Sequence, residues 1–421
     1  MAGERLVSVL PALADPLAAV SAMTERLDPV GVEPVALGGG VGRVLAEPAV
    51  AERDSPAADV SAMDGYAVRA EAVGSAIDQA GEAVLPVAFE VETGHEPPAL
   101  PEGVAARVFT GGVVPRGADA VVRREFVREG GDEVGFAADA LADLKPGLNI
   151  RRRGENAAAG QTLLEPGVRI TPAAVATLAA NGRGVVSVFR KVRVGVAVSG
   201  NEVVATGRAG VDVAAVRDAN GPSLRALIEA TGWAECVEVV PLPDDLEATR
   251  RGLEDLAARC DALVTTGGVS MGDHDVLPDA IAALGAEVVY HHLAMRPGKP
   301  NLGAVLPGGV AVVALPGNPV SVLVGAAVLA GPVLRRRAGF AAEPSRVRLA
   351  VHAGPVLARP MKFRQYVPAA LTEAGGLRPL SHRGSGDVAA IGATDGVFEL
   401  PPGEHATDGP PRRWFPWTLS P

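Results

Sequence analysis

Four polar, glycine-rich segments hold the residue types that could do chemistry in this chain. They are 199–202 (Ser-Gly-Asn-Glu), 265–275 (Thr-Thr-Gly-Gly-Val-Ser-Met-Gly-Asp-His-Asp), 295–300 (Met-Arg-Pro-Gly-Lys-Pro) and 316–321 (Pro-Gly-Asn-Pro-Val-Ser). Each follows an apolar run that predicts a buried strand. Because the carboxyl ends of parallel strands lie at one edge of a sheet, we expect all four segments to line the same cavity.

The glycines and cations of these segments suit an anionic ligand. Without Cβ atoms, Gly267 and Gly268 allow backbone amides to approach an anion closely. Two helices expected to begin beside the segments would add the partial positive charge of their amino ends. Arg296 and Lys299 supply fixed positive charge.

Acidic residues gather at the same expected edge of the sheet. They are Glu202, Asp244, Asp245, Asp273 and Asp275. Mg²⁺ prefers hard oxygen ligands and is commonly held by one or two carboxylates together with phosphate oxygens. The residues therefore predict a Mg²⁺-assisted site for a nucleotide or another phosphorylated anion.

These features also have a purely structural interpretation. The Gly267-Gly268 pair could form only a tight turn. Asp244 and Asp245 could act only as favourable charges at the start of a helix. The arginine runs at 151–153 and 335–337 are typical of solvated faces.

Two further patterns suggest other chemistry on thinner grounds. Residues 268–272 fit G-x-S-x-G, which would make Ser270 a nucleophile, with Asp279 and His352 as candidate partners that nothing else marks. The loop also continues past residue 272 instead of leading directly into a helix. His291 and His292 are neighbours on an expected strand, so their side chains should point to opposite faces and share no metal.

The composition limits the classes of function. The 421 residues include 39 basic and 49 acidic side chains, for a formal net charge of −10. This balance disfavours general binding to the phosphates of nucleic acid. An aromatic content of 4% leaves few stacking platforms for single strands. We expect no nucleic-acid partner, and an anionic substrate must find a pocket that is locally basic.

The thiols and the uncharged run indicate a soluble cytoplasmic protein. Cys236 and Cys260 lie in apolar contexts, which predicts buried thiols and not a disulfide framework. The first residues show no export signal. Residues 300–334 carry no charge, but Pro307, Pro316 and Pro319 interrupt the run, so we expect a buried core and no membrane contact.

The elements that must position the four segments fall into regions of different character. Residues 51–144 hold short β-type runs between glycines and prolines, which predict an inserted β-rich domain. Residues 1–50 and 145–185 include helical patterns at 16–27 and 171–181 and predict a helical linker domain. Residues 339–421 return to short strands and predict a C-terminal β domain that resembles a barrel.

Residues 186–338 alternate apolar strands with helices. The expected strands are 192–198, 236–240, 262–266, 288–291 and 310–315, and the expected helices are 222–230, 244–259, 275–284 and one from 319. This order predicts a doubly wound α/β domain with a parallel sheet covered on both faces. The predicted fold class is therefore multidomain, α/β plus β.

Six motifs in order give the chain a resemblance to a known family. They occupy 61–67 (Ser-Ala-Met-Asp-Gly-Tyr-Ala), 110–122, 149–155, 267–275, 297–300 and 315–321. Each is unspecific alone, but six in the right order and spacing are specific. The chain resembles the molybdopterin molybdenumtransferase family, MoeA-like proteins whose relatives include the E domain of gephyrin. The resemblance covers almost the whole chain.

The resemblance implies a function and an assembly. The α/β domain would be a MogA-like molybdopterin-binding domain. The protein would be a homodimer whose site forms between the α/β domain of one subunit and the β domain of the other. The implied reaction takes adenylyl-molybdopterin and molybdate, releases AMP and leaves molybdenum on the pterin dithiolene. A MogA-like adenylyltransferase and apo-molybdoenzymes would be its partners.

The resemblance also implies roles for individual residues. The catalytic set would be Asp64, Thr110, Glu202, Asp244, Asp245 and Asp275, of which Glu202, Asp244 and Asp275 would hold Mg²⁺. The set that binds the substrates would be Ser199, Gly200, Gly267, Gly268, Ser270, Gly272, Asp273, Arg296, Lys299, Pro316, Gly317, Asn318 and Ser385. Within it, Arg296 and Lys299 with Ser385 would hold the molybdate dianion, because fixed cations attract it.

Several positions depart from the family's pattern. Asn201 replaces the acid of T-G-D-E, Arg296 replaces the first lysine of M-K-P-G-K, and Ala219 replaces the serine of D-S-N. Residues 394–395 (Thr-Asp) stand where A-N-G has its asparagine. The loss of one charge at Asn201 motivates an alternative function, a catalytically weakened paralogue or scaffold that still binds pterin or molybdate.

Overall fold

A six-stranded sheet forms the centre of the larger of two units into which the chain divides. The computed structural model describes residues 13–419 except 138–142, 208, 211, 271–274, 342–347, 352–360, 382 and 405–410. The larger unit comprises the chain up to residue 47, 166–173 and 185–421, and the smaller unit comprises 48–165 and 174–184. The division into four domains stays a prediction.

The central sheet is mostly parallel. Its order is β16 (Ala234–Leu242), β13 (Val192–Ser199), β17 (Ala262–Thr266), β21 (Ala311–Leu315), β20 (Leu302–Val305) and β18 (Glu287–His291). The parallel sheet that the sequence predicts contains one exception, β20, which runs antiparallel to both of its neighbours. This short strand forms a hairpin with β21 through Gly308 and Gly309, whose φ angles are 87° and 81°.

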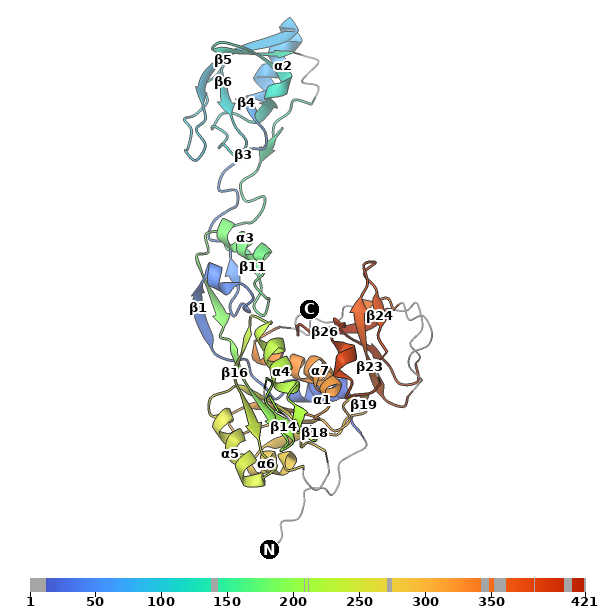
Figure 1. Ribbon diagram of the computed structural model, residues 1–421. Coiled ribbons are helices and arrows are strands. Elements are labelled where there is room, and N and C mark those ends of the chain that lie inside the picture. Colours follow the sequence, from blue (N-terminus) through green and yellow to red (C-terminus); the bar gives the residue numbers. More distant parts are fainter. Residues whose placement is uncertain are drawn as a thin grey trace. The chain divides into compact units, whose positions relative to one another are not determined.

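Helices cover both faces of this sheet, as the alternation predicts (Figure 1). On one face lie α5 (Leu246–Ala257) and α6 (Leu277–Ala283), which pack against alternate residues such as Val312 and Ala314. The other face of the sheet is covered by α1 (Pro16–Thr24), α4 (Asn220–Glu229) and the helical run Pro319–Arg337. This run contains α7 (Pro319–Gly325) and α8 (Gly331–Arg337). Val313 and Leu315 point into this second core.

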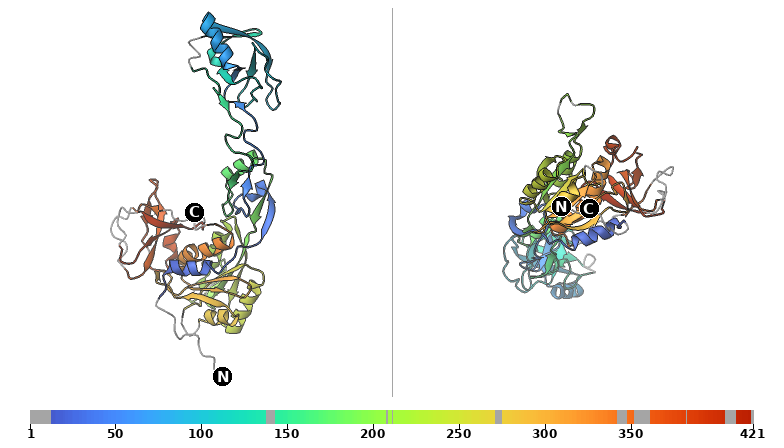
Figure 2. Two further views of the ribbon diagram at one scale, coloured as in Figure 1. Left: turned by 180° about the vertical axis from the view of Figure 1, so that it is seen from behind. Right: turned by 90° about the horizontal axis from the view of Figure 1, so that it is seen from below.

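The first helix is therefore a layer of the larger unit. Figure 2 shows α1, in blue, beside the orange helices, and Ala19, Val20 and Met23 are buried in the same core as the central strands. The expectation that residues 1–50 are mainly helical is wrong, because β1 (Val32–Ala36) pairs antiparallel with β12 (Val185–Phe189).

The long uncharged run is buried, as predicted. The continuous helix Pro319–Arg337 is long and apolar enough to cross a bilayer, but 83% of its most apolar window lies inside the protein. Its terminal arginines are not a solvated face. Arg335 stacks on the Phe340 ring at 3.7 Å, and Arg336 donates to the carbonyl of Leu27 at 2.8 Å.

The last part of the larger unit is a second sheet. Its order is β19 (Met295–Arg296), β23 (Arg364–Leu371), β25 (Gly396–Leu400), β26 (Arg412–Pro416) and β22 (Arg348–Leu349), with β24 (Leu377–Pro379) beside β23. A short helix, α9 (Val388–Ile391), precedes β25. The strand β19 is only two residues long, which explains why no apolar pattern predicts it.

The smaller unit is rich in strands, as expected. Its sheet has the order β7 (Ala120–Arg123), β4 (Gly65–Val68), β6 (Ala105–Val108), β5 (Glu82–Glu90), β9 (Glu133–Ala137) and β8 (Val127–Gly130). The helix α2 (Ala70–Ala80) packs on β5. The remaining pieces are β2 (Ala49–Val50), β3 (Val60–Ser61), β10 (Ile150–Arg151), β11 (Thr162–Leu164) and α3 (Pro172–Ala180).

An ion-pair cluster holds the amino-terminal edge of the central sheet. The carboxylate of Asp261 accepts two hydrogen bonds of 2.6 Å from Arg190 and one of 2.8 Å from the Arg193 amide. Burial alone would raise the pKa of Asp261. The hydrogen bonds and positive charges of the two arginines outweigh burial and lower the pKa to about 2.

We predict that Asp261→Asn lowers the free energy of unfolding by about 2 kcal/mol at pH 7, because the native carboxylate ionises more readily than an unfolded one. This contribution is complete above pH 4 and disappears as the pH falls toward 2. Urea unfolding of wild type and variant at pH 7 and pH 3 measures the difference. A difference that stays constant down to pH 2 contradicts the assignment.

Candidate functional site

Three of the four polar segments meet at the carboxyl edge of the central sheet. The strands β13, β17 and β21 are parallel neighbours, so the loops that follow them start side by side. The amide of Gly267 donates to the carbonyl of Leu315 at 3.1 Å, and the hydroxyl of Thr266 donates to the carbonyl of Pro316 at 3.3 Å. The predicted convergence of these three loops is confirmed.

The loop after β17 passes so close to β13 that it needs glycine. Gly267 has φ 85°, and a Cβ there would lie 2.4 Å from the carbonyl oxygen of Ser199. Gly268 has φ 57°, and its Cβ would lie 3.0 Å from the Ser199 hydroxyl. The close approach, and not only turn formation, explains this pair of glycines.

Two neighbouring acids, predicted together, have different surroundings. Asp244 accepts hydrogen bonds from the hydroxyl of Ser199 at 3.3 Å and from the amide of Asn201 at 3.0 Å, so it faces the β13 loop. Asp245 instead caps α5 by accepting from the amide of Ala248 at 2.8 Å. The helix therefore starts at Leu246, later than expected, and only Asp244 lines the cavity described next.

An acidic pocket of about 710 Å³ opens between these loops. Its carboxylates are Glu202, Asp244 and Asp275, together with Asp218. The other predicted residues that line it are Ser199, Gly200, Gly267, Gly268, Ser270, Pro316, Gly317 and Asn318. We call this cavity the acidic pocket.

The acidic pocket has the chemistry of a Mg²⁺ site, although its acids are spread around it. Within the described residues, no three acidic, histidine or cysteine side chains converge closely enough to hold a metal by themselves. Carboxylate oxygens are nevertheless the donors that Mg²⁺ prefers, and the ion usually keeps phosphate and water ligands as well. The donor set thus fits the ion when a phosphorylated ligand supplies further oxygens.

Sequence reasoning missed the residues that α4 brings to this pocket. Asn220 is buried, and its side-chain amide donates to the Thr266 hydroxyl at 3.0 Å and to the Gly317 carbonyl at 2.8 Å. It therefore ties α4 to the ends of two strands. Asp218 and Arg217 line the pocket beside it. The Asp218-Ala219-Asn220 motif was the available signal, but no expected strand leads into it.

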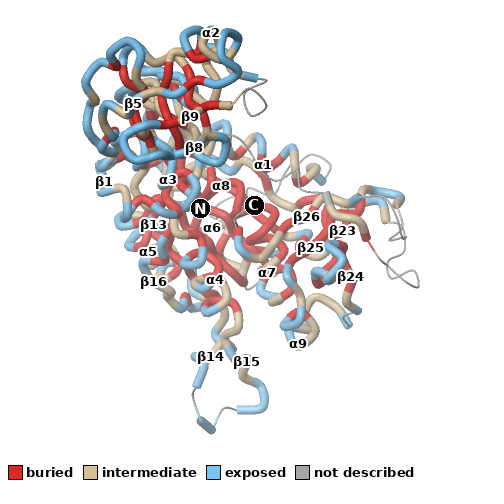
Figure 3. The backbone as a smooth tube through the Cα atoms, turned by 90° about the horizontal axis from the view of Figure 1, so that it is seen from above, coloured by how far each residue is buried: buried red, intermediate tan, exposed pale blue. Residues whose placement is uncertain are grey.

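The segment before α4 leaves the sheet. It runs through β14 (Val203–Val204) and β15 (Val216–Arg217), which pair with each other. Figure 3 shows both strands projecting from the buried core, and β15 is exposed. This excursion returns the chain to the pocket at Asp218, whose carboxylate accepts from the Gly221 amide at 2.8 Å.

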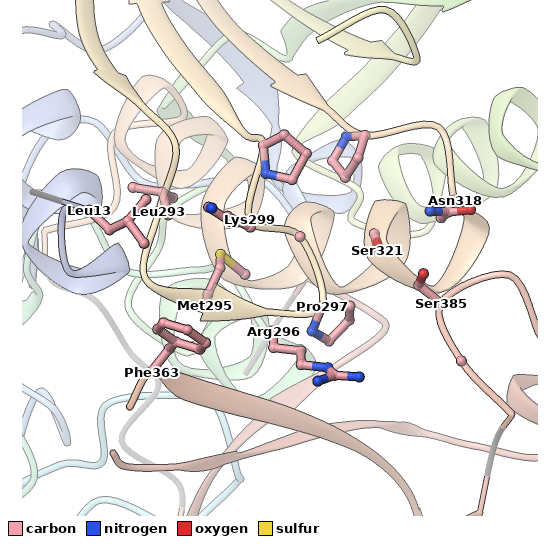
Figure 4. Close-up of a pocket in the computed structure, with 14 residues that line it drawn as sticks. Leu13, Leu293, Met295, Arg296, Pro297, Lys299, Asn318, Ser321, Phe363 and Ser385 are labelled. Carbon is pink, nitrogen blue, oxygen red and sulfur yellow. The ribbon is translucent and has the colours of Figure 1, made fainter. Parts of the chain in front are cut away.

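A second, basic pocket of about 350 Å³ contains the two predicted cations. Arg296 and Lys299 are exposed on it, and neither makes an ion pair with another described residue. Figure 4 shows Asn318, Ser321 and Ser385 at one end of the pocket. The opposite end is apolar and is formed by Leu13, Leu293, Met295 and Phe363.

The Lys299 turn is held by buried hydrogen bonds. The amide of Leu293 donates to the Lys299 carbonyl at 2.8 Å, and the fully buried Asn301 side chain donates to the Gly298 carbonyl. Gly298 has φ 95°. Lys299 therefore projects from a rigid turn toward the basic pocket.

The expectation of a single cavity is wrong. Glu202 and Asp275 line the acidic pocket, whereas Arg296 and Lys299 line the basic pocket. The two pockets adjoin, because Pro300, Pro316 and Asn318 line both. Within the described residues, neither Arg296 nor Lys299 makes an ion pair with the acids of the neighbouring pocket.

The histidine pair differs from its prediction. His292 has φ 63°, which turns its side chain back, and its ring stacks on His291 at 4.1 Å between centroids. The His291 ring lies 3.2 Å from the Val269 carbonyl in the loop after β17. Burial and the charges of His291 and Lys299 lower the pKa of His292 below its ordinary value.

The smaller unit holds the last two predicted residues in contact with each other. The Asp64 carboxylate accepts from the Thr110 amide at 2.7 Å and from the Thr110 hydroxyl at 2.8 Å. These hydrogen bonds, the backbone one first, lower the pKa of Asp64. The next residue, Gly65, must be glycine, because a Cβ there would lie 2.0 Å from the Val122 carbonyl oxygen.

Other expectations have mixed outcomes. Gly272, Asp273 and His352 lie outside the described residues. Ser270 lines the acidic pocket, and the next described helix, α6, begins at Leu277. The arginines at 151–153 are largely exposed, as expected of a solvated face, and they also make ion pairs, such as Arg152 with Asp59 at 2.6 Å.

Comparison with known proteins gives consistent matches. Residues 12–182 match the family described as "MoeA N-terminal region (domain I and II)", and residues 195–336 match the family described as "Probable molybdopterin binding domain". The chain is 34% identical to the molybdopterin molybdenumtransferase of Nostoc sp. over 86% of this chain and 83% of that protein. Molybdopterin molybdenumtransferase 2 of Mycobacterium tuberculosis is also 34% identical, over 86% of this chain and 88% of its own.

A solved structure resembles almost the entire chain. The molybdopterin biosynthesis moeA protein from Pyrococcus horikoshii OT3 matches with a TM-score of 0.80 and 27% sequence identity. The match covers 96% of this chain and 99% of that one. The multidomain α/β plus β fold class is confirmed.

We predict that Gly267→Ala destabilises the larger unit by at least about 1–2 kcal/mol, because alanine resists the left-handed conformation and its methyl group collides with the Ser199 carbonyl. Gly317→Ala is the matched control, since its Cβ would meet only backbone atoms of Gly267, the nearer at an ordinary 3.6 Å. Thermal unfolding measures both variants. Equal unfolding temperatures for the two would show that the close approach does not constrain residue 267.

Proposed function

The chain belongs to the molybdopterin molybdenumtransferase family and is a transferase of molybdenum cofactor biosynthesis, and on that premise we propose that it inserts molybdenum from molybdate into adenylyl-molybdopterin with release of AMP. The observation that carries the proposal is the adjoining pair of pockets. One presents carboxylates beside glycine backbone, and the other presents two cations that make no ion pair within the described part of the chain.

The acidic pocket suits the nucleotide end of the substrate. Its volume of about 710 Å³ lies in the range of cofactor sites. Gly267 and Gly268 let the backbone approach the phosphates, and Glu202, Asp244 and Asp275 would hold Mg²⁺. When bound there, Mg²⁺ would neutralise negative charge on the phosphoanhydride. The chain's own contribution is positioning, which accounts for much of the catalysis in reactions of phosphate esters.

The basic pocket suits the oxyanion. Molybdate is a dianion, and Arg296 and Lys299 provide two donors of matching charge. Asn318, Ser321 and Ser385 add neutral polar groups at the same pocket. Because Asn318 borders both pockets, the oxyanion would lie next to the adenylylated pterin, as the transfer of molybdenum to the dithiolene requires.

The proposal includes the assembly and the partners. Asp64 and Thr110, carried by the smaller unit, would complete the site of the other subunit in a homodimer. A MogA-like adenylyltransferase would supply the substrate, and apo-molybdoenzymes would receive the product in the cytoplasm. The buried, free thiols Cys236 and Cys260 suit that reducing compartment.

A relative that binds without turnover is the second candidate. Asn201 motivates it, because an acid at this position would add one charge beside Asp244. However, the Asn201 side-chain oxygen still accepts from the Asp244 amide at 3.4 Å. The substitution thus keeps the local hydrogen bond while it removes charge. Calorimetric binding of adenylyl-molybdopterin without accelerated AMP release would favour this candidate.

We predict that purified protein with Mg²⁺ and molybdate accelerates AMP release from adenylyl-molybdopterin, and that Glu202→Gln lowers this rate by about 100-fold. Glu202 is exposed, so its loss should change the free energy of unfolding by less than about 0.5 kcal/mol. Glu235→Gln, an exposed acid at the start of β16, is the control. AMP release by the wild type that is no faster than release without protein would overturn the proposed reaction.

We predict that Lys299→Met weakens molybdate binding by about tenfold or more, since a hydrogen bond to a charged group contributes roughly 1.5–3 kcal/mol. Lys191→Met removes the same charge just before β13, at the opposite edge of the sheet, and should bind normally. Isothermal titration with sodium molybdate compares them. Equal affinities for the two variants would exclude Lys299 from the oxyanion site.

A further inference from the structure

Arg364 joins three segments that border the basic pocket, although it does not line the pocket itself. Its Nε donates to the Asp15 carboxylate at 2.6 Å, and its Nη1 donates to the Glu399 carboxylate on β25. The Glu399 side chain is only 7% exposed, so this pairing is largely shielded from water.

Asp15 divides its two oxygens between a helix and this arginine. Its Oδ1 caps α1 by accepting from the amides of Leu17 at 2.9 Å and Ala18 at 3.3 Å. Its Oδ2 accepts from Arg364. The start of α1 is therefore fixed to the second sheet by a charge-assisted bond, which is stronger than a neutral one.

The backbone around these residues leads directly to the pocket. The Arg364 amide donates to the Ala294 carbonyl at 3.1 Å, and the Ala294 amide donates to the Ala14 carbonyl at 2.8 Å. These bonds place the segment 13–15, the segment 293–296 and the start of β23 in consecutive contact. Three residues of the apolar end lie on or beside these segments: Leu13, Leu293 and Phe363, which immediately precedes β23 (Figure 4).

We propose that Arg364 is a positioning residue for the oxyanion site, and that its bond to Asp15 holds Leu13 over the apolar end of the basic pocket. The inference rests on the proposed function, in which this pocket binds molybdate. Leu13 is partly exposed at 37% and forms one wall of this apolar end. An apolar wall beside the oxyanion leaves less water to screen charge, which strengthens the attraction between the oxyanion and the cations Arg296 and Lys299.

The direction of the effect separates positioning from simple electrostatics. Asp15→Asn keeps a good helix cap, because asparagine caps as well as aspartate, but it removes the charge that binds Arg364. If only net charge mattered, the loss of a negative charge near the pocket would strengthen molybdate binding. If Arg364 positions the wall, the same substitution weakens binding.

The experiment compares Asp15→Asn with Glu287→Gln by titration with sodium molybdate and, separately, with AMP. Glu287→Gln also removes one negative charge and breaks an ion pair just after the end of α1, that with Arg26 at 2.7 Å. We expect Asp15→Asn to bind molybdate about tenfold more weakly and AMP unchanged, and Glu287→Gln to bind both normally. Molybdate affinity that is equal to or tighter than wild type in Asp15→Asn overturns the inference.

A second variant guards against a folding defect. Arg364→Lys keeps the charge but cannot bridge two carboxylates in the same planar geometry, so it should also weaken molybdate selectively. Wild-type binding of molybdate that depends on Lys299, with normal binding by Asp15→Asn and Arg364→Lys, would refute only the positioning role. No molybdate binding by the wild type would refute the proposed function and this inference together.

Discussion

The approach of Gly267 to the Ser199 carbonyl is the constraint on which the site depends. The loop after β17 can cross the end of β13 only because residue 267 carries a hydrogen where another residue would carry Cβ. This crossing brings the β17 loop against Ser199, whose hydroxyl contacts Asp244, and against the β21 loop through the Leu315 carbonyl. The acidic pocket therefore depends on the close packing of the loops at the ends of β13, β17 and β21.

Much of the fold is readable from the sequence because its strongest signals are local. The strand β17 begins and ends where its apolar run predicts, and most helices of the α/β region start within a few residues of the expected position. The failures have physical causes. The capping role of Asp245 moves the start of α5, and the short hairpin strand β20 carries too few residues to show a period.

The site was predictable where residues with suitable chemistry directly follow a predicted strand. Glycines, carboxylates and cations after strand ends mark both pockets, and the six motifs identify the family. Asn220 was not predictable in this way, because its role depends on contacts with Thr266 and Gly317, far away in sequence. The separation of the acids from the cations could not be predicted either. A sequence shows which charges are present, but it does not show that Pro300 and Pro316 lie between them in space.

The border that the two pockets share, formed by Pro300, Pro316 and Asn318, has a thermodynamic consequence. Any occupant that shifts this border alters the free energy of the occupant on the other side. Linkage requires the effect to be reciprocal, so each ligand changes the affinity of the other by the same factor. In the proposed function, cooperativity between nucleotide and oxyanion would therefore depend on a few shared atoms and would need no large conformational change.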